Sequence, residues 1–278
     1  MMPLFHKVSQ MCSGITTSEY SSSFSSAINL LNLDLRAPIR NIYGLVRFAD
    51  EIVDTFHDYD KKVLLAEFRQ ATFEAIERRI SLNPILHSFQ LTVNQYGIDH
   101  RLIHAFFDSM EMDLGEQFYT QSVYDEYIYG SAESVGLMCL YVFCDGDRAK
   151  YDQLEASAKA LGAAFQKVNF LRDVKNDHEL LNRTYFPGVD FRNFTSANKK
   201  EIEDDIAEDF RQAYHGIVRL PWKAKFGVYV AYKYYYSLFN KIKRLQPSRI
   251  LDERVRIPNY RKAMIVMRAG LKNQLNLL

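Results

Sequence analysis

The chain has 278 residues, of which 47% are hydrophobic, so it can bury a sizeable core. Its formal net charge of +1, without a basic block interleaved with aromatic residues, argues against a nucleic-acid-binding protein. Three cysteines without CxxC spacing predict reduced thiols instead of a disulfide framework. We expect no signal peptide and no membrane span, because the sequence has no long uncharged apolar run. These features together predict a cytoplasmic protein.

Apolar residues recur with a helical period in nearly every segment, and strand-like alternation bounded by hairpin dipeptides is missing. We find no internal repeat and no low-complexity linker, which predicts one all-helical domain over 1–278. A loop is expected at 13–18, another at 182–200, and a basic connector at 247–258 before a last helix. The other expected helices cover residues 3–12, 19–31, 34–56, 60–80, 84–96, 99–114, 124–143, 148–180, 201–220 and 222–245.

The expected helix at 124–143 is apolar and carries small residues in its first half, including Gly130 and Gly136. A glycine inside a helix costs about 1 kcal/mol relative to alanine. The small side chains would let another helix or a ligand approach closely.

Two of the expected helices carry aspartates four residues apart. Asp50 and Asp54 lie in YGLVRFADEIVDT, and Asn169, Asp173 and Asp177 lie in GAAFQKVNFLRDVKND. Residues with this spacing share one face of a helix. Apolar residues surround both stripes, and burying an unpaired carboxylate is costly. Each stripe therefore needs a cation, either an arginine or lysine or a hard metal ion.

A bound metal ion would explain why two helices carry aspartates with this spacing. Two carboxylate helices that face each other can hold Mg²⁺, which prefers one or two carboxylates together with water and phosphate oxygens. Such a site suits a departing diphosphate and leaves an allylic cation that an apolar, ring-lined cavity must protect from water. In the alternative interpretation the aspartates form salt bridges, as Arg47 could with Asp50. The histidines show no HExxH spacing, so we expect no zinc site.

A hydroxyl-rich stretch that contains Ser21 and Ser23 lies near the start of the helix expected at 19–31. Serines at such a position cap the helix or bind a phosphate. Position alone favours capping.

Six segments occur in an order and spacing that resemble one family, the squalene/phytoene synthases. They are SSSF at 21–24, YGLVRFADEIVD at 43–54, MD at 112–113, YIYGSAESVG at 127–136, AFQKVNFLRDVKND at 164–177 and NRTYFP at 182–187. The segments extend over the first two-thirds of the chain, and the pattern is most similar to bacterial phytoene synthases. The resemblance implies the all-α class I isoprenoid (terpenoid) synthase fold, a helical bundle around a central cavity.

The resemblance implies two aspartate-rich motifs that bind Mg²⁺, with Mn²⁺ as an alternative ion. The first motif departs from the family at Glu51, where a second aspartate is common, and the second at Asn176, where glutamate is common. We therefore leave both out of the expected metal ligands. These are Asp50, Asp54, Asn169, Asp173 and Asp177.

The resemblance also implies residues that hold the substrates. Arg47, Ser21 and Ser23 would bind diphosphate. The centre of the site would be lined by Tyr129, a catalytic residue together with the aspartates, and by Gln166 and Asn169. Arg183 and Tyr185 match a family loop and would grip a phosphate or close the site, or would only brace the loop.

The implied reaction joins two geranylgeranyl diphosphates head to head into phytoene, through a cyclopropylcarbinyl diphosphate, in carotenoid biosynthesis. No NADPH is expected, and the sequence has no GxGxxG nucleotide motif. The first alternative is a dehydrosqualene or squalene synthase that uses farnesyl diphosphate. Terpene cyclases, chain-elongating prenyl transferases, a non-catalytic helical scaffold and a general helical binding module are more distant alternatives.

Prenyl diphosphates are the expected binding partners, and downstream carotenoid enzymes are candidate partners. Because substrate and product are apolar, we also expect peripheral contact with the inner face of the membrane.

Overall fold

A computed structural model of the chain describes residues 2–115, 120–180, 186–189, 193–252 and 254–274, without the side chains of 175–180, 251–252 and 274. These residues contain helices and no β-strand, so the prediction of an all-α protein is confirmed. The helices are α1 (Met2–Tyr20), α2 (Ser22–Ile28), α3 (Leu33–Asp54), α4 (Lys61–Arg78), α5 (Pro84–Tyr96), α6 (His100–Met112), α7 (Gln121–Ile128), the π-helical turn η1 (Tyr129–Glu133), α8 (Ser134–Cys144), α9 (Arg148–Leu180), α10 (Ser196–Ile217), α11 (Trp222–Lys243), α12 (Pro247–Asp252) and α13 (Asn259–Gln274).

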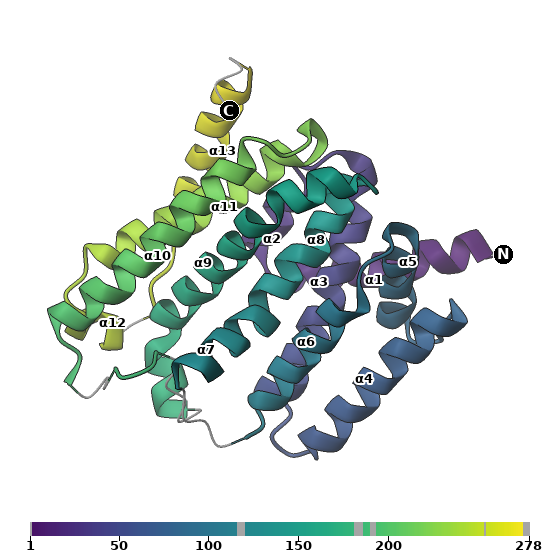
Figure 1. Ribbon diagram of the computed structural model, residues 1–278, viewed down its shortest axis with the longest axis horizontal. Coiled ribbons are helices and arrows are strands. Elements are labelled where there is room, and N and C mark those ends of the chain that lie inside the picture. Colours follow the sequence, from purple (N-terminus) through teal and green to yellow (C-terminus); the bar gives the residue numbers. More distant parts are fainter. Residues whose placement is uncertain (1, 116–119, 181–185, 190–192, 253, 275–278) are drawn as a thin grey trace.

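The helices lie side by side in a bundle, and most of them run along a similar diagonal in Figure 1. Helix α9 has 33 residues and contacts α8, η1, α10, α11 and α12. Helix α3 contacts α1, α2, α4, α5, α6 and α8. The two helices that carry the predicted aspartate motifs are therefore both surrounded by other helices.

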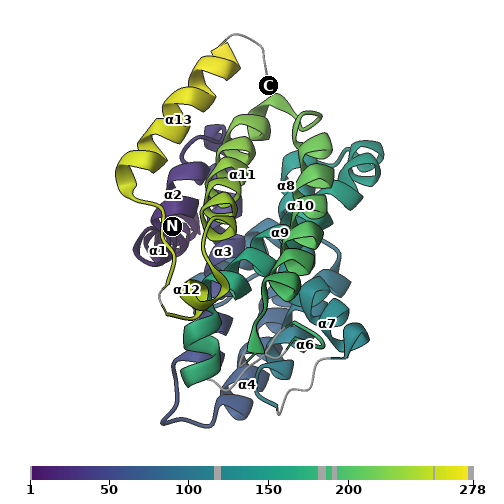
Figure 2. The same cartoon turned by 90° about the vertical axis from the view of Figure 1, so that its left-hand side faces the viewer.

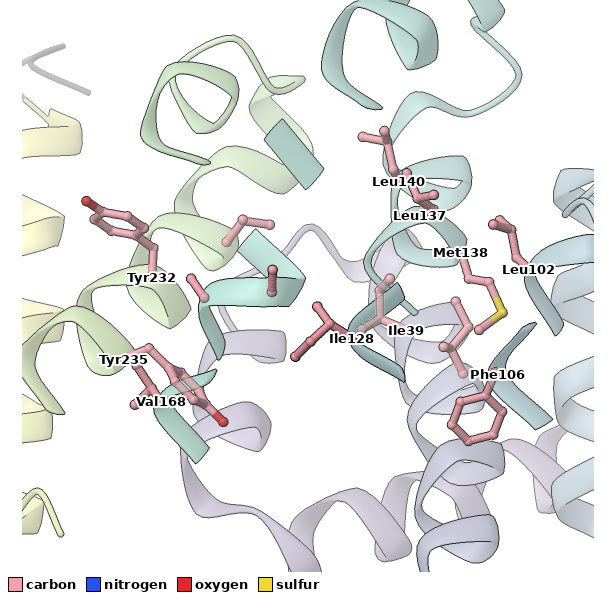
Figure 3. Packing of buried hydrophobic residues seen from close by; sticks show 14 of the residues in the cluster. Ile39, Leu102, Phe106, Ile128, Leu137, Met138, Leu140, Val168, Tyr232 and Tyr235 are labelled. Atoms are coloured by element: carbon pink, nitrogen blue, oxygen red, sulfur yellow. The ribbon is translucent and has the colours of Figure 1, made fainter. Parts of the chain in front are cut away.

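A hydrophobic cluster connects these helices (Figure 3). Val168 of α9 and Tyr235 of α11 lie close together in one part of it, and Phe106 of α6 lies with Met138 of α8 in another. Fully burying one such side chain stabilises the folded state by roughly 1.5–3 kcal/mol. The cluster thereby fixes α9 between the α6–α8 side of the bundle and α11.

The starts of α4, α5 and α6, each with a side-chain cap, were predicted to within one residue. Asp60, Asn83 and Asp99 accept hydrogen bonds from backbone N–H groups in the first turns of α4, α5 and α6. Gly97 ends α5 with a φ of +62°, a conformation that glycine adopts without strain. Local capping chemistry therefore determines these ends.

The N-terminal region differs from the prediction, because the expected loop at 13–18 is the second half of α1. Thr16 and Thr17 donate to the carbonyl oxygens of Cys12 and Ser13, four residues earlier, at 3.0 and 2.8 Å. The Ser13 hydroxyl forms a 2.6 Å hydrogen bond with that of Ser88 on α5. Hydroxyl residues favour loops when they compete with the helical backbone. Here they are satisfied within α1 and across its interface, so the helix continues.

The single helix expected at 124–143 is divided by η1, so that prediction was wrong in detail. The close approach expected at its small residues is confirmed. A Cβ atom on Gly130 would lie 2.3 Å from the carbonyl oxygen of Ala105 on α6. A Cβ atom on Gly136 would lie 2.9 Å from that of Ala158 on α9. By length and composition the stretch Gln121–Cys144 could cross a membrane, but 56% of its apolar window is buried inside the protein, as in a core helix.

Two further boundaries differ from the prediction near the C-terminal end. Helix α10 begins at Ser196 instead of 201, because Thr195 and Asn198 form a capping box. The connector expected at 247–258 contains the short helix α12.

Candidate active site

The first predicted motif gathers negative charge at the end of α3. Burial, together with the charges of Asp54 and Asp113 and against the lowering effect of Arg47, raises the pKa of Asp50 to about 8. Asp113, at the end of α6, is buried and accepts a 2.8 Å hydrogen bond from the Tyr127 hydroxyl. A cation placed here would relieve the repulsion between these carboxylates.

Arg47 offers a donor to an anion beside this motif. Its guanidinium group pairs with Glu51 and lies 3.8 Å from Asp50, measured from Nη1 to Oδ2. Its Cζ atom lies 4.3 Å from the centre of the Tyr20 ring. The Arg47 Nε atom is buried and has no hydrogen-bond partner among the described residues. A buried donor without a partner is costly, and an anionic oxygen would satisfy it.

The second motif lies on α9 and is partly neutralised by arginines. Arg172 and Arg254 both contact Asp173, with Nη2–Oδ2 and Nε–Oδ1 distances of 2.6 and 2.7 Å. The Tyr235 hydroxyl of α11 donates a 3.3 Å hydrogen bond to the Asn169 side-chain oxygen. Asp173 thus forms the salt bridges that the sequence left as its alternative interpretation, with Arg254 reaching it from beyond α12.

Four aromatic rings from α2, α3, α9 and α11 pack together, and two of them belong to the helices that carry the motifs. The Phe24 ring centre lies 6.0 Å from that of Tyr43, 6.1 Å from Phe165 and 5.8 Å from Tyr235. The rings of Phe165 and Tyr235 stack at 3.9 Å. We refer to these four residues as the aromatic cluster.

The pKa values of two tyrosines in the aromatic cluster are affected by charged residues of the two motifs, one tyrosine by each motif. Burial raises the pKa of Tyr43 to about 12, with smaller effects from Arg47 and Asp50. Burial likewise raises the pKa of Tyr235, with effects from Arg172 and Asp173. Since the two tyrosines belong to one cluster, the aspartate helices face a shared, partly apolar region.

The predicted diphosphate-binding serines lie at the start of α2. Ser21 caps this helix, because its hydroxyl accepts a 3.2 Å hydrogen bond from the Phe24 N–H. Capping, which position alone favoured, is thus confirmed. Ser23 is half-buried in the first turn of α2. Their contact with diphosphate stays a prediction.

The residues predicted to line the centre of the site lie in different surroundings. Gln166 is half-buried on α9, three residues before Asn169. The Tyr129 ring lies under Lys159, with Nζ 5.7 Å from its centre. Among the described residues, Tyr127 is the member of the YIYG segment that contacts a carboxylate of the site. The catalytic role of Tyr129 therefore stays a prediction.

Three predicted residues cannot be placed from the described part of the chain. Arg183 and Tyr185 lie outside the described residues, as does the side chain of Asp177, whose backbone belongs to α9. Within the described residues, no three His, Cys, Asp or Glu side chains form a group that could hold a metal ion. Mg²⁺ that takes part of its coordination from phosphate and water does not need such a group. The donor set around Asp50 and Asp54 therefore fits Mg²⁺ bound together with a diphosphate.

A cavity of about 300 Å³ lies elsewhere, between α10 and α11. It is lined by Phe210, Tyr214, Tyr232, Tyr236 and Phe239 together with polar residues, and by no residue of the predicted site.

Residues 17–261 match the family model described as squalene/phytoene synthase. The chain belongs to the squalene/phytoene synthase family. Members of this family are prenyltransferases, and the match includes both aspartate helices, the aromatic cluster and Arg254.

Relatives within the family carry different product names. The chain is 28% identical over 199 residues to 4,4'-diapophytoene synthase of Staphylococcus haemolyticus. The aligned residues cover 69% of this chain and 66% of that protein. It is 25% identical over 291 residues to phytoene synthase of Arthrospira platensis, covering 95% of this chain and 92% of the relative. These relatives share the family and differ in the product that their names give.

The fold agrees with that of a solved relative. A crystal structure of a dehydrosqualene synthase in complex with ligand superposes with a TM-score of 0.83 and covers 98% of both chains, at 17% sequence identity. The expected class I isoprenoid synthase fold is thereby confirmed.

Four residues near the motifs were missed by the sequence-based prediction. Asp113 and Tyr127 lie in segments that carried the family resemblance, which was a usable signal. Tyr235 lies in a run of tyrosines whose members the sequence does not distinguish. Arg254 lies 81 residues after its partner Asp173, and no local pattern indicates that contact.

Proposed function

We propose that this protein joins two prenyl diphosphates head to head, with geranylgeranyl diphosphate as substrate and phytoene as product. The observation that carries the proposal is that two aspartate helices, α3 and α9, face one aromatic cluster. The buried Arg47 Nε donor beside them suits a diphosphate oxygen. Family membership supports the reaction class.

The reaction has two ionisation steps. In the first, the C–O bond of one prenyl diphosphate breaks, and the double bond of the second molecule attacks the allylic cation. A proton leaves, and a cyclopropylcarbinyl diphosphate remains. In the second, the remaining diphosphate departs, the cation rearranges to join the chains head to head, and loss of another proton gives phytoene. No electrons are added, so NADPH is not required.

The residues of this chain bind, orient and shield the reactants. Arg47 would hold the diphosphate, and the aromatic cluster would exclude water from the cation. Mg²⁺, held by Asp50 and Asp54 and, from α9, by Asn169, Asp173 and Asp177, would supply the positive charge that makes diphosphate a good leaving group.

Product analysis tests the proposal directly. Purified protein is incubated with Mg²⁺ and geranylgeranyl diphosphate without NADPH, and the extracted hydrocarbons are identified. We expect a forty-carbon product from the wild type and at least about a hundredfold less from Asp50→Asn, which keeps the shape and removes the charge. Absence of hydrocarbon from a folded wild type would reject the proposal.

A thirty-carbon product is the second candidate. The similarity to 4,4'-diapophytoene synthase favours it as much as other relatives favour phytoene. Farnesyl diphosphate in a parallel reaction, and in direct competition with geranylgeranyl diphosphate, separates the two. A preference for farnesyl diphosphate would keep the mechanism and replace the substrate.

A further inference from the structure

Two helices carry apolar stripes that are exposed. Residues spaced four, three and four apart lie on one face of a helix. A contiguous exposed apolar surface of this kind marks an interaction site. On α13 the stripe is formed by Tyr260, Met264, Met267 and Leu271, with exposed fractions of 61%, 38%, 65% and 62%. On α1 it is formed by Leu4, Val8, Met11 and Ile15, with exposed fractions of 66%, 47%, 55% and 59%.

Packing inside the protein does not account for the stripe on α1. Helix α1 contacts α3 and α5, and its buried residues are Ser9, Ser13, Thr16 and Thr17. Its hydroxyl face is therefore turned inward and its apolar face outward. This is the reverse of the usual arrangement of a surface helix in water.

The two helices that carry these stripes lie on one side of the molecule (Figure 2). In Figure 2, α13, α2 and α1 all lie along the left-hand edge. Helix α13 packs on α11, and the amino group of Lys262 in α13 donates a 2.9 Å hydrogen bond to the Ser22 hydroxyl in α2. Helix α2 in turn contacts α1. The three helices thus form one continuous side.

The charge of α13 indicates what this side would contact. The helix contains four cationic residues and no acidic one: Arg261, Lys262, Arg268 and Lys272. Lys233 of α11 lies near Lys272 and adds a further cation. A helix with an apolar stripe flanked by cations binds anionic lipid surfaces. In a symmetric dimer through α13, the same cations would face each other, which disfavours a second copy of this chain.

We propose that α13 and α1 dock the protein onto an anionic lipid bilayer. The apolar stripes enter the headgroup boundary, and Arg261, Arg268 and Lys272 of α13 contact lipid phosphates. The argument uses exposed residues outside the candidate active site, so it does not depend on the proposed reaction.

Vesicle flotation of the full chain, without substrate, tests the proposal. We expect co-migration with vesicles of phosphatidylglycerol and phosphatidylcholine, weaker co-migration with phosphatidylcholine alone, and loss of binding as salt rises. Met267→Ser/Leu271→Ser should weaken partitioning at least about tenfold, because two inserted side chains are lost. Arg268→Glu/Lys272→Glu should abolish the preference for anionic vesicles.

The matched control is Tyr59→Ser/Val63→Ser. These residues are 68% and 50% exposed and lie before and in α4, away from α13 (Figure 1). This variant should bind vesicles like the wild type, whereas Met11→Ser/Ile15→Ser on α1 should bind more weakly.

Three results would overturn the proposal. One is a wild type that does not float with anionic vesicles at low salt, and another is an equal loss in the α4 control. The third is a wild-type dimer in size-exclusion chromatography that Met267→Ser/Leu271→Ser dissociates, without any effect on flotation. Circular dichroism of each variant shows that its fold is retained, which the exposure of the substituted residues leads us to expect.

Discussion

At the scale of single residues, the two aspartate motifs have different charged neighbours. Asp50 faces other carboxylates, and burial raises its pKa to about 8. Asp173 lies between the guanidinium groups of Arg172 and Arg254. A cation that binds Asp173 must therefore compete with Arg172 and Arg254.

Arg254→Gln removes one of these competitors. An ion pair with an arginine 43% exposed contributes no more than about 1 kcal/mol, so the melting temperature of the metal-free protein should fall only slightly. The Mg²⁺ concentration that half-saturates the thermal shift in the presence of pyrophosphate should fall several-fold. For Arg254→Lys, which keeps the charge, the half-saturating Mg²⁺ concentration should lie between the values of the wild type and Arg254→Gln. An unchanged Mg²⁺ midpoint in Arg254→Gln would show that Arg254 does not compete.

Tyr235→Phe tests whether the orientation of Asn169 matters. The hydrogen bond from Tyr235 is long, at 3.3 Å, so its loss should cost about 1 kcal/mol of stability or less. If Asn169 acts in the site, kcat should fall several-fold while KM stays close to the wild-type value. Tyr232→Phe, on the face of α11 that lines the α10–α11 cavity, is the control and should retain full activity. Equal kinetics of the two variants would remove Tyr235 from the site.

Where the helical repeat aligns residues, the sequence predicted which of them share a helix face. Asp50 and Asp54, and Asn169 and Asp173, share faces because they are four residues apart. Arg254 and Asp113 could not be predicted in this way, since their contacts depend on how distant segments pack. Likewise, the helical period of the YIYG segment does not show that Tyr127, and not Tyr129, reaches a carboxylate.

At the scale of elements, η1 shows the limit of pattern-based prediction. A 3.6-residue period describes α7 and α8 equally well with or without one wider turn between them. The turn lies where Gly130 contacts the α6 backbone and where Gly162 of α9 approaches Ala132. The neighbouring helices α6 and α9 thus both contact this turn closely. The small residues in the sequence predicted a close approach, but they did not identify these two partners.

Gly130→Ala should disrupt this contact. The added methyl group would lie 2.3 Å from the Ala105 carbonyl oxygen and 2.7 Å from Ser109 Cβ, and neither atom is on a flexible chain end. We expect a loss of about 1–3 kcal/mol in the free energy of unfolding, measured with urea. Gly270→Ala is the control, because nothing lies within 4 Å of its Cβ position in α13. It should leave stability unchanged or raise it by up to about 1 kcal/mol.

At the scale of the whole molecule, a partly buried charge cluster links α9 to α10. The Lys167 amino group lies 2.6 Å from Asp205 Oδ2 and 2.8 Å from Asp209 Oδ2. Burial raises the pKa of Asp209 to about 6, although Lys167 lowers it in part. Burial also raises the pKa of the nearby Glu133 carboxyl group on η1. The interface is therefore sensitive to pH near neutrality.

Stability should fall as pH rises through this range. The raised pKa means that the folded protein holds the Asp209 proton more tightly than the unfolded chain does. Its stabilising contribution is complete below about pH 4 and is lost as pH rises through about 6. The contribution amounts to at most about 3 kcal/mol for a shift of about two units.

Comparison with Asp209→Asn isolates this effect. The free energy of unfolding of both proteins is measured with urea from pH 5 to 8. As the pH rises, it should fall more in the wild type than in the variant. Other titrating groups, including Glu133, contribute to both proteins and cancel to first order. A difference that does not change with pH would contradict the prediction.

The overall arrangement of the helices was predictable only through family resemblance. Helical periodicity predicted an all-α protein, and capping residues indicated the starts of α4, α5 and α6. Neither indicates that α9 lies between α8 and α10 or that α2 supplies a ring to the aromatic cluster, because such contacts join segments far apart in the chain.

The hydroxyl-lined interface of α1 has a consequence for how the protein opens. The buried residues of α1 are all serines and threonines, so detaching this helix exposes groups that water can satisfy and little apolar surface. We expect its backbone amides to exchange with deuterium well before those of α8, whose buried residues are mostly apolar. Tyr20, at the end of α1, covers the guanidinium group of Arg47. The first segment to fray would therefore also uncover the residue proposed to grip the diphosphate.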